Sequence, residues 1–314
     1  MTARLFTEIS LRDVRARNRI VVSPMCQYSA KDGHVSDWHL VHLGKFAQGG
    51  AGIVFVEATA VEKRGRITHG DTGIWDDAHI AGLRRISQFL KEQGAVPGLQ
   101  LAHAGRKASM ARPWYGNGPL TQADLDRGDK PWSTIAPTAT PIDAAWITPR
   151  AMKEGDFQVV LEAYRNATRR ALAAGFEVLE LHAAHGYLLH TFLSPLSNPG
   201  PMQDRIRFPL QVAQAVRKGW PASKPLFVRL SSTDAYEAPW REGYAASRLL
   251  LPDVLTRPAV RGQAMVELKS LYTQQGLILD PHELTEPGIA GGFRFEPRMP
   301  DGYKRPTGPV GGGG

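Results

Sequence analysis

Five short apolar runs rich in β-branched residues alternate with longer amphipathic segments, and this alternation restricts the fold more than any other feature. The runs are Arg19–Ser23, Gly52–Glu57, Val96–Leu101, Phe176–His182 and Pro225–Leu230. Between them lie four segments with helical spacing, each ending at a glycine: Asp37–Gly49, Asp76–Gly94, Thr148–Gly175 and Arg207–Gly219. Strands that alternate with helices predict parallel pairing with right-handed crossovers. The candidates are an open doubly wound sheet and a (β/α)8 barrel.

The segment after the first run separates these two folds. An open dinucleotide-binding sheet needs a GxGxxG turn there, whereas the sequence reads Pro-Met-Cys-Gln-Tyr and contains no P-loop. Polar and special residues instead follow several different strands: Cys26, Tyr28, Glu57, Ala58, Gln100, His103, His182, His185 and Arg229. Barrels collect their chemistry at the carboxyl ends of their strands. We therefore predict an α/β fold of the (β/α)8 TIM-barrel type, incomplete, with strands one to five recognisable.

The composition changes near residue 240. Residues 241–314 hold 12 glycines and 8 prolines, whereas the first 240 residues hold 20 glycines and 15 prolines. This density is typical of low-complexity sequence. We therefore expect a folded barrel portion, residues 1–240, and a glycine- and proline-rich tail, residues 241–314, of poor order.

Charge and cysteine content restrict the class of protein. The single cysteine, Cys26, excludes an intrachain disulfide and a cysteine-rich metal site. No run approaches the ~18 apolar residues of a membrane span, and Met1–Asp13 is too charged for a signal peptide, so we expect a cytoplasmic protein without a membrane partner. The net charge of +8 comes from scattered residues, which we interpret as solvated faces. Nucleic-acid binding is the competing interpretation, and no recognition motif supports it.

The densest polar cluster is His182-Ala-Ala-His185-Gly-Tyr187. Two imidazoles three residues apart on a turn can donate to one carbonyl or oxyanion, and the tyrosine can deliver a proton. Zinc binding is a second reading, although no third ligand accompanies the pair, and structural histidines are a third. His39 and His42 share this spacing on a helix, where we expect packing or surface roles.

Two polar residues interrupt apolar strands. Arg229 is a cation in such a strand and needs an anion, which is either an internal carboxylate or a bound anionic group. Gln100 offers both a donor and an acceptor, which suits the edge of a heteroaromatic ring. An isolated Cys26 is most often a small core residue, but its neighbours change that interpretation.

Three motifs in order resemble the old yellow enzyme family, in particular its thermophilic-like ene-reductase branch, and the resemblance covers roughly residues 5–240. They are Ser23-Pro-Met-Cys-Gln-Tyr28, Leu101-Ala-His-Ala-Gly-Arg-Lys-Ala108, and Leu181-His-Ala-Ala-His-Gly-Tyr187 with Phe192-Leu-Ser-Pro-Leu-Ser-Asn198. The resemblance implies an FMN-containing barrel that takes hydride from NADPH or NADH and reduces activated alkenes such as enones. It also implies a small-molecule substrate and the capacity to form homo-oligomers.

The resemblance also implies site roles. The flavin would be lined by Ser23, Pro24, Met25, Cys26 and Ala58, with the Cys26 thiol tuning its potential. Gln100 would bind the pyrimidine end of the ring, and Arg229 the N1/C2 carbonyl region. His182 and His185 would bind the substrate carbonyl, Tyr187 would protonate the adjacent carbon, and Tyr28 would contact the substrate.

The resemblance stops where the family pattern needs strands six to eight. These barrels commonly bind phosphate after strands seven and eight, and no matching motif follows Asp234. The segment Pro199–Asp204 also replaces a longer loop of the family. The alternative hypothesis is therefore a truncated or aberrant family product that cannot retain FMN and has no activity.

Overall fold

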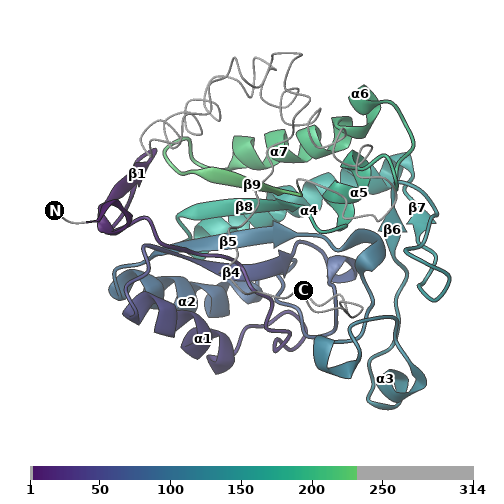
Figure 1. Ribbon diagram of the computed structural model, residues 1–314, viewed down its shortest axis with the longest axis horizontal. Coiled ribbons are helices and arrows are strands. Elements are labelled where there is room, and N and C mark those ends of the chain that lie inside the picture. The colour runs from purple at the N-terminus through teal and green to yellow at the C-terminus, as the bar shows by residue number, and fades with distance from the viewer. Residues whose placement is uncertain (1–2, 232–314) are drawn as a thin grey trace, which may run out of the picture. The chain divides into compact units, whose positions relative to one another are not determined.

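A five-stranded parallel sheet forms the centre of the computed structural model, which describes residues 3–231 (Figure 1). Its order is β3-β4-β5-β8-β9, and the strands are Val21–Val22, Ile53–Ala60, Val96–Ala102, Val178–Ala183 and Leu226–Leu230. Each strand overlaps one predicted run, and every neighbouring pair is parallel. The predicted strands and their pairing are therefore confirmed.

Four long helices connect these strands. They are α1 (Asp37–Gln48), α2 (His79–Glu92), α4 (Glu154–Ala173) and α7 (Arg207–Gly219). Helix α1 packs against β4, α2 and α4 pack against β5, and α4 also packs against α7. The order of strands and helices is that of a (β/α)8 barrel over its first five strands.

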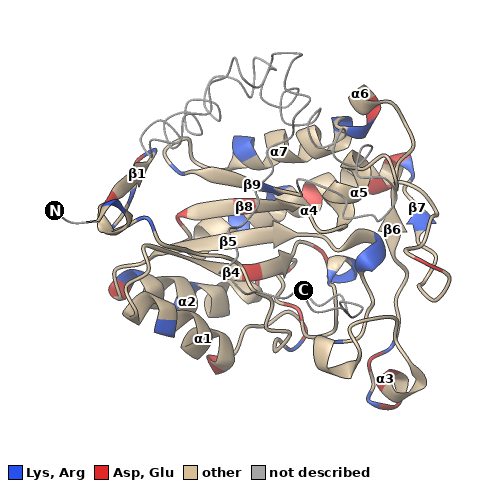
Figure 2. Ribbon diagram, viewed as in Figure 1, with Lys and Arg blue, Asp and Glu red and all other residues tan. Residues whose placement is uncertain are grey.

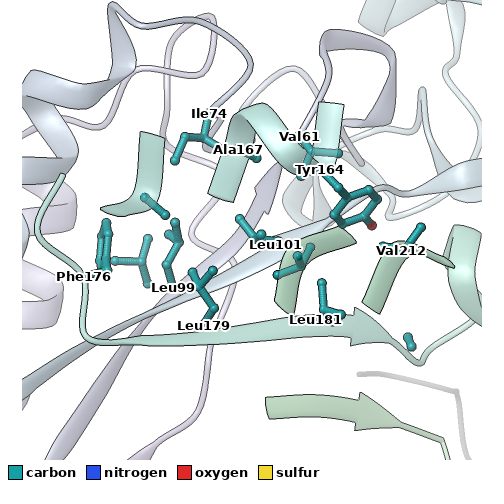
Figure 3. Packing of buried hydrophobic residues seen from close by; sticks show 14 of the residues in the cluster. Val61, Ile74, Leu99, Leu101, Tyr164, Ala167, Phe176, Leu179, Leu181 and Val212 are labelled. Carbon is teal, nitrogen blue, oxygen red and sulfur yellow. The ribbon is translucent and has the colours of Figure 1, made fainter. Parts of the chain in front are cut away.

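The face of the sheet that meets the helices is apolar. Leu99 and Leu101 of β5 and Leu179 and Leu181 of β8 alternate along their strands and are at most 1% exposed (Figure 3). They lie in one cluster with residues of α4 and α7, among them Tyr164, Ala167 and Val212. Full burial of one such leucine contributes roughly 1.5–3 kcal/mol. The residues between these leucines point to the opposite face, where the polar groups are found.

The sheet curls strongly toward that opposite face. Strands β4 and β9 are separated by two strands, which corresponds to about 14 Å in a flat sheet. The rings of Phe55 on β4 and Phe227 on β9 nevertheless lie 6.0 Å apart. Gly98 on β5 makes room for this packing, because a Cβ atom there would lie 2.5 Å from the Phe55 ring. The short distance between these rings shows that the sheet is curved like the wall of a barrel.

Two helices begin later than the sequence pattern predicts. Helix α2 begins at His79 instead of Asp76, since the Asp76 carboxylate accepts from the N–H of Ala78 at 2.9 Å and forms a turn before the helix. Helix α4 begins at Glu154 instead of Thr148, because Arg150–Ala151 form strand β7, which pairs with β6 (Ile135–Ala136). Periodicity alone did not detect this small two-stranded sheet.

The helix ends follow the glycine prediction in part. Gly94 and Gly175 directly follow the C-caps of α2 and α4 and have φ angles of +76° and +84°, the left-handed conformation that glycine adopts without strain. Helix α7 differs, because Gly219 is its last helical residue and Trp220 continues in extended conformation. In α7 the glycine therefore does not act as a left-handed cap.

Shorter elements surround the carboxyl end of the sheet. The described residues also form the hairpin β1 (Ile9–Leu11) and β2 (Val14–Ala16), the helices α3 (Gln122–Asp126), α5 (Leu188–Leu193) and α6 (Met202–Arg205), and the 3-10 turns η1 (Arg4–Phe6), η2 (Lys63–Gly65), η3 (Gly105–Lys107) and η4 (Pro113–Tyr115). Turn η3 follows β5 and packs against α5, which follows β8. This contact joins two of the loops that carry the predicted site residues.

Charged residues are scattered over the helices and loops of the described part (Figure 2). Several of the arginines contact acids: Arg169 and Arg170 both contact Asp77, and Arg85 contacts Asp37. Across residues 3–231, no helix combines the length and apolar character needed to cross a bilayer. The predicted boundary at residue 240 and the tail 241–314 lie outside the described residues.

Candidate active site

The predicted site residues converge at the carboxyl ends of five neighbouring strands. Ala58 on β4 pairs in register with Gln100 on β5, which pairs with Glu180 on β8. Two residues further along β8, His182 pairs with Arg229 on β9. Strand register therefore brings together side chains that lie up to 171 positions apart in the sequence, from residue 58 to residue 229.

Glu180 links two of the predicted cofactor-binding residues. Its Oε1 atom accepts from Gln100 Nε2 at 2.6 Å and from Arg229 Nε at 2.7 Å, and Arg229 Nη2 lies 3.3 Å from Oε2. The carboxylate is 7% exposed and the Arg229 side chain 32%. Of the two anions left open for Arg229, the structure therefore contains an internal carboxylate. The pair uses two of the five guanidinium N–H donors.

His182 is held as a neutral hydrogen-bond donor. Its Nδ1 atom accepts from the main-chain N–H of Ala184 at 3.2 Å, so the ring proton is on Nε2. Burial, followed by the neighbouring groups His185 and Arg229, lowers the pKa of His182 to about 3. The imidazole therefore stays uncharged at neutral pH and presents one N–H group.

Tyr187 and the two histidines form one aromatic group. The His182 ring lies 5.0 Å from His185 and 4.8 Å from Tyr187, in both cases edge to face. Burial and the Arg229 cation also lower the pKa of His185. Burial raises the pKa of Tyr187, with Cys26 and Asp71 adding to the effect. The phenol therefore keeps its proton at neutral pH, as a proton donor must.

Lys107 supports the turn that carries His185. Its Nζ atom donates to the main-chain carbonyl of His185 at 2.9 Å and lies 5.5 Å from the centre of the Tyr187 ring. His185 has a φ angle of +59°, a conformation that costs a non-glycine residue energy. The lysine therefore stabilises a turn whose strained backbone places the second histidine.

The loop after β3 approaches the same group from the other side. Cys26 and Tyr28 are half-buried and pack with Tyr187 around Ala104, Ala108 and Met110. Burial and contact with Cys26 raise the pKa of Tyr28. The Tyr28 ring also meets Trp114 of η4 edge-on at 6.3 Å. Cysteine, two tyrosines and the histidine pair thus face a common region.

The remaining predicted flavin-lining residues lie on the same strands and loop. Ser23 and Met25 are exposed and Pro24 is half-buried, all in the loop after β3. Ala58 is 4% exposed at the end of β4. These positions are compatible with the predicted roles, which stay predictions.

Sequence reasoning did not single out several groups of this site. Glu180 lies two residues before His182, so the two-residue period of a strand places both side chains on one face, and this signal was available. Lys107 lies within a motif already identified. Glu57 was noted at a strand end without a role, and Asp71 carries no sequence signal, because only the fold of the loop around it buries its carboxylate.

Comparison with known proteins agrees with this geometry. Residues 4–246 match the NADH:flavin oxidoreductase / NADH oxidase family. An NADPH dehydrogenase of Geobacillus thermodenitrificans is 43% identical over 242 residues, which cover 74% of this chain and 65% of the relative. An NADH:flavin oxidoreductase of Gibberella zeae is 43% identical over 243 residues, 75% of this chain and 58% of the relative. The chain thus spans about three fifths of the length of these curated relatives.

Solved structures give the same result. Morphinone reductase superimposes with a TM-score of 0.66 at 25% identity, covering 79% of this chain and 68% of that protein. Old yellow enzyme from Pichia sp. AKU4542 gives a TM-score of 0.68 at 22% identity, covering 83% and 69%, and so shows the shared barrel fold. The chain belongs to the NADH:flavin oxidoreductase / NADH oxidase family, to which the old yellow enzymes are related in fold.

Proposed function

We propose that this chain is an FMN-dependent oxidoreductase that takes hydride from NAD(P)H and reduces the double bond of an activated alkene such as an enone. The observation that carries the proposal is the packing of His182, His185 and Tyr187, with ring centres 4.8–6.5 Å apart. Two neutral donors for a carbonyl and one protonated phenol are the groups that such a reduction requires.

The residues present fit the ring of FMN. The inward face of the sheet offers an amide at Gln100 and a guanidinium at Arg229 beside the small side chain of Ala58, and the loop after β3 adds the Cys26 thiol. The Gln100 carbonyl oxygen can accept from a ring N–H, and the Arg229 cation favours electron density on a neighbouring ring carbonyl. When bound, FMN would supply the two-electron chemistry that no side chain of the protein provides.

The protein's own groups would orient and polarise the substrate. The Nε2–H group of His182, with His185 beside it, would donate to the carbonyl oxygen of an enone and draw electron density from the double bond. A neutral imidazole gives this hydrogen bond without placing a buried cation next to Arg229. Tyr187 would deliver the proton to the carbon next to the carbonyl. The Tyr28 ring and Cys26 would bound the substrate on the side of the β3 loop.

An anaerobic assay tests the proposal against simple oxidase activity. The chain supplied with FMN is incubated with NADPH and 2-cyclohexenone, and NADPH loss and cyclohexanone formation are measured together. We expect one cyclohexanone for each NADPH consumed without oxygen. NADPH consumption that requires oxygen and gives no cyclohexanone contradicts alkene reduction and leaves an NADPH oxidase.

A further inference from the structure

A buried carboxylate that has no part in the proposed reaction lies directly behind the β3 loop. Glu57 is 3% exposed, and its Oε1 atom accepts from the Thr72 hydroxyl at 2.5 Å. Its Oε2 atom accepts from the main-chain N–H of Gln27, the residue after Cys26. His39 Nε2 of α1 lies 3.4 Å from Oε1. One carboxylate therefore connects β4, α1, the Thr72 segment and the cysteine loop.

The backbone of β4 is adapted to this side chain. The pairing of β4 with β5 shifts register between Val56 and Ala58, so Glu57 is the extra residue of a β-bulge. Such bulges redirect a side chain and are frequent beside active sites. His39 is oriented toward the carboxylate as well, because its Nδ1 atom accepts from the N–H of Ser36 at 3.0 Å and its proton is therefore on Nε2.

A second buried carboxylate, that of Asp71, also acts electrostatically on Cys26. Asp71 is 4% exposed and accepts from the N–H groups of Ile67 and Thr68 at 2.5 and 2.9 Å, and from the Thr68 hydroxyl at 2.9 Å. Burial raises the pKa of Asp71 to about 7, with the Glu57 charge contributing. The charges of two acids, Glu57 and Asp71, raise the pKa of the Cys26 thiol, and two phenols, Tyr28 and Tyr187, pack in the same cluster as Cys26. On α1, His39 and His42 face Glu57 in turn.

We propose that Glu57 is the positioning residue of Cys26: its carboxylate fixes the loop through Gln27, and its buried negative charge keeps the sulfur as a thiol. A carboxylate charge beside the loop disfavours a second negative charge on sulfur. Burial, then Glu57 and Asp71, raises the pKa of the Cys26 thiol in agreement with this geometry. The protein thereby presents a neutral S–H group instead of a thiolate.

The inference rests on the proposed function only for the statement that a flavin lies next to this sulfur. A thiolate would place a negative charge near the ring and oppose the gain of electrons, whereas a thiol does not. The Glu57 carboxylate would then act on the flavin potential through Cys26 without touching the flavin.

Because Cys26 is the only cysteine, its titration can be followed in the whole protein. The rate of alkylation by iodoacetamide is measured from pH 6 to pH 11 for the wild type, Glu57→Gln and Glu57→Ala. The glutamine keeps an oxygen for the Gln27 N–H but removes the charge, whereas the alanine removes both. Glu177→Gln is the matched control, because Glu177 contacts Lys91 and Lys224 before β8 begins, at the opposite end of the sheet.

We expect Glu57→Gln to lower the pH midpoint of alkylation by about one unit with the same plateau rate. Glu57→Ala should lower the midpoint similarly and also raise the plateau rate several-fold, since the loop is no longer fixed. Glu177→Gln should change neither value. An unchanged midpoint in a folded Glu57→Gln variant, judged by circular dichroism, overturns the role of the charge. An unchanged plateau in Glu57→Ala overturns the role of the loop contact.

The thiol readout is independent of FMN and of any substrate. If the chain fails to bind FMN but the midpoints shift as expected, the proposed function fails and the Glu57 assignment stands. If FMN binds and the midpoints do not shift, the Glu57 assignment fails and the proposed function is not affected.

Discussion

The guanidinium of Arg229 on β9 donates to the carboxylate of Glu180 on the neighbouring strand β8, with 2.7 Å between Nε and Oε1. The same carboxylate oxygen accepts from Gln100 on β5, so one buried anion orders two residues of the proposed cofactor site. Arg229 therefore has two proposed roles that experiments can distinguish: an internal ion pair with Glu180 and a contact with FMN.

Removal of the Arg229 cation alone should lower both the stability of the protein and its affinity for FMN. In Arg229→Met the Glu180 carboxylate loses its cationic partner and keeps only the Gln100 amide, and we expect the free energy of unfolding to fall by about 1–3 kcal/mol, since Arg229 is partly solvated. FMN affinity should fall at least tenfold. The double variant Arg229→Met/Glu180→Gln removes the unpaired charge and should recover most of the stability but not the FMN affinity. Urea unfolding of the flavin-free protein and FMN titration check the two outcomes. Recovery of affinity in the double variant would show that Arg229 acts only through Glu180.

Tyr187 should be needed for proton delivery and not for binding FMN. We expect Tyr187→Phe to lower kcat for enone reduction by about 10²- to 10⁴-fold, because a buried phenol with a raised pKa is replaced by a ring without a proton. Reduction of the bound flavin by NADPH should stay within a few-fold of the wild type. Stopped-flow measurement of the two half-reactions separates these steps. Tyr28→Phe serves as the control and should change KM more than kcat. Equal losses in both half-reactions of Tyr187→Phe would contradict a proton-donor role.

His182 should make the protein less stable in mild acid. Its pKa is about 3 in the folded state, whereas an unfolded histidine titrates near 6.5. Below pH 6.5 His182 binds a proton in the unfolded chain but stays neutral in the folded one. Its contribution to the free energy of unfolding is therefore complete above pH 6.5 and is lost as the pH falls toward 3. At pH 5 the loss is about 2 kcal/mol.

The variant His182→Asn isolates this effect, because the asparagine oxygen can still accept from the N–H of Ala184. Between pH 7.5 and pH 5, the wild type should lose about 2 kcal/mol more unfolding free energy than the variant. Urea titrations at both pH values measure the difference. Parallel losses in the two proteins would mean that His182 carries a proton in the folded state.

Gly105 should be required for the approach of η3 to α5. Its φ angle is +61°, and a Cβ atom there would lie 2.8 Å from the Cα atom of Leu188, the residue after Tyr187. We expect Gly105→Ala to cost about 1–3 kcal/mol of unfolding free energy and to lower kcat for enone reduction by displacing Tyr187. Gly155→Ala is the control, since nothing lies within 4 Å of a Cβ atom at Gly155 in the first turn of α4. Unchanged unfolding free energy and unchanged enone kinetics in Gly105→Ala would contradict the requirement for close contact between η3 and α5.

Much of the fold was predictable because its signals are local. The runs around Val54, Leu99 and Leu179 are mostly apolar and are buried on both faces, as expected for parallel strands, and the left-handed glycines Gly94 and Gly175 mark two helix ends. The small sheet of β6 and β7 was missed, since two-residue strands have no periodicity and their pairing joins residues 15 positions apart, Ile135 and Arg150.

The site was predictable where motifs carry it and not where tertiary contacts do. The positions of His182, His185 and Tyr187 follow from one short segment. The partner of Arg229 depends on strand register across 49 positions, so the sequence left an internal carboxylate and a bound anion open. His39 was expected to have a packing or surface role, and the structure buries it 3.4 Å from Glu57, because a bulge in β4 turns that carboxylate toward α1. Neither the strand register nor the bulge produces a periodic pattern in the sequence.

Visible absorption tests most directly whether these five strands and their loops hold FMN for hydride transfer. The purified chain is titrated with FMN, freed of excess, reduced anaerobically with NADPH, and then given 2-cyclohexenone. We predict a retained flavin band that bleaches with NADPH and returns with the enone. A folded protein that retains no flavin band at saturating FMN would contradict the account.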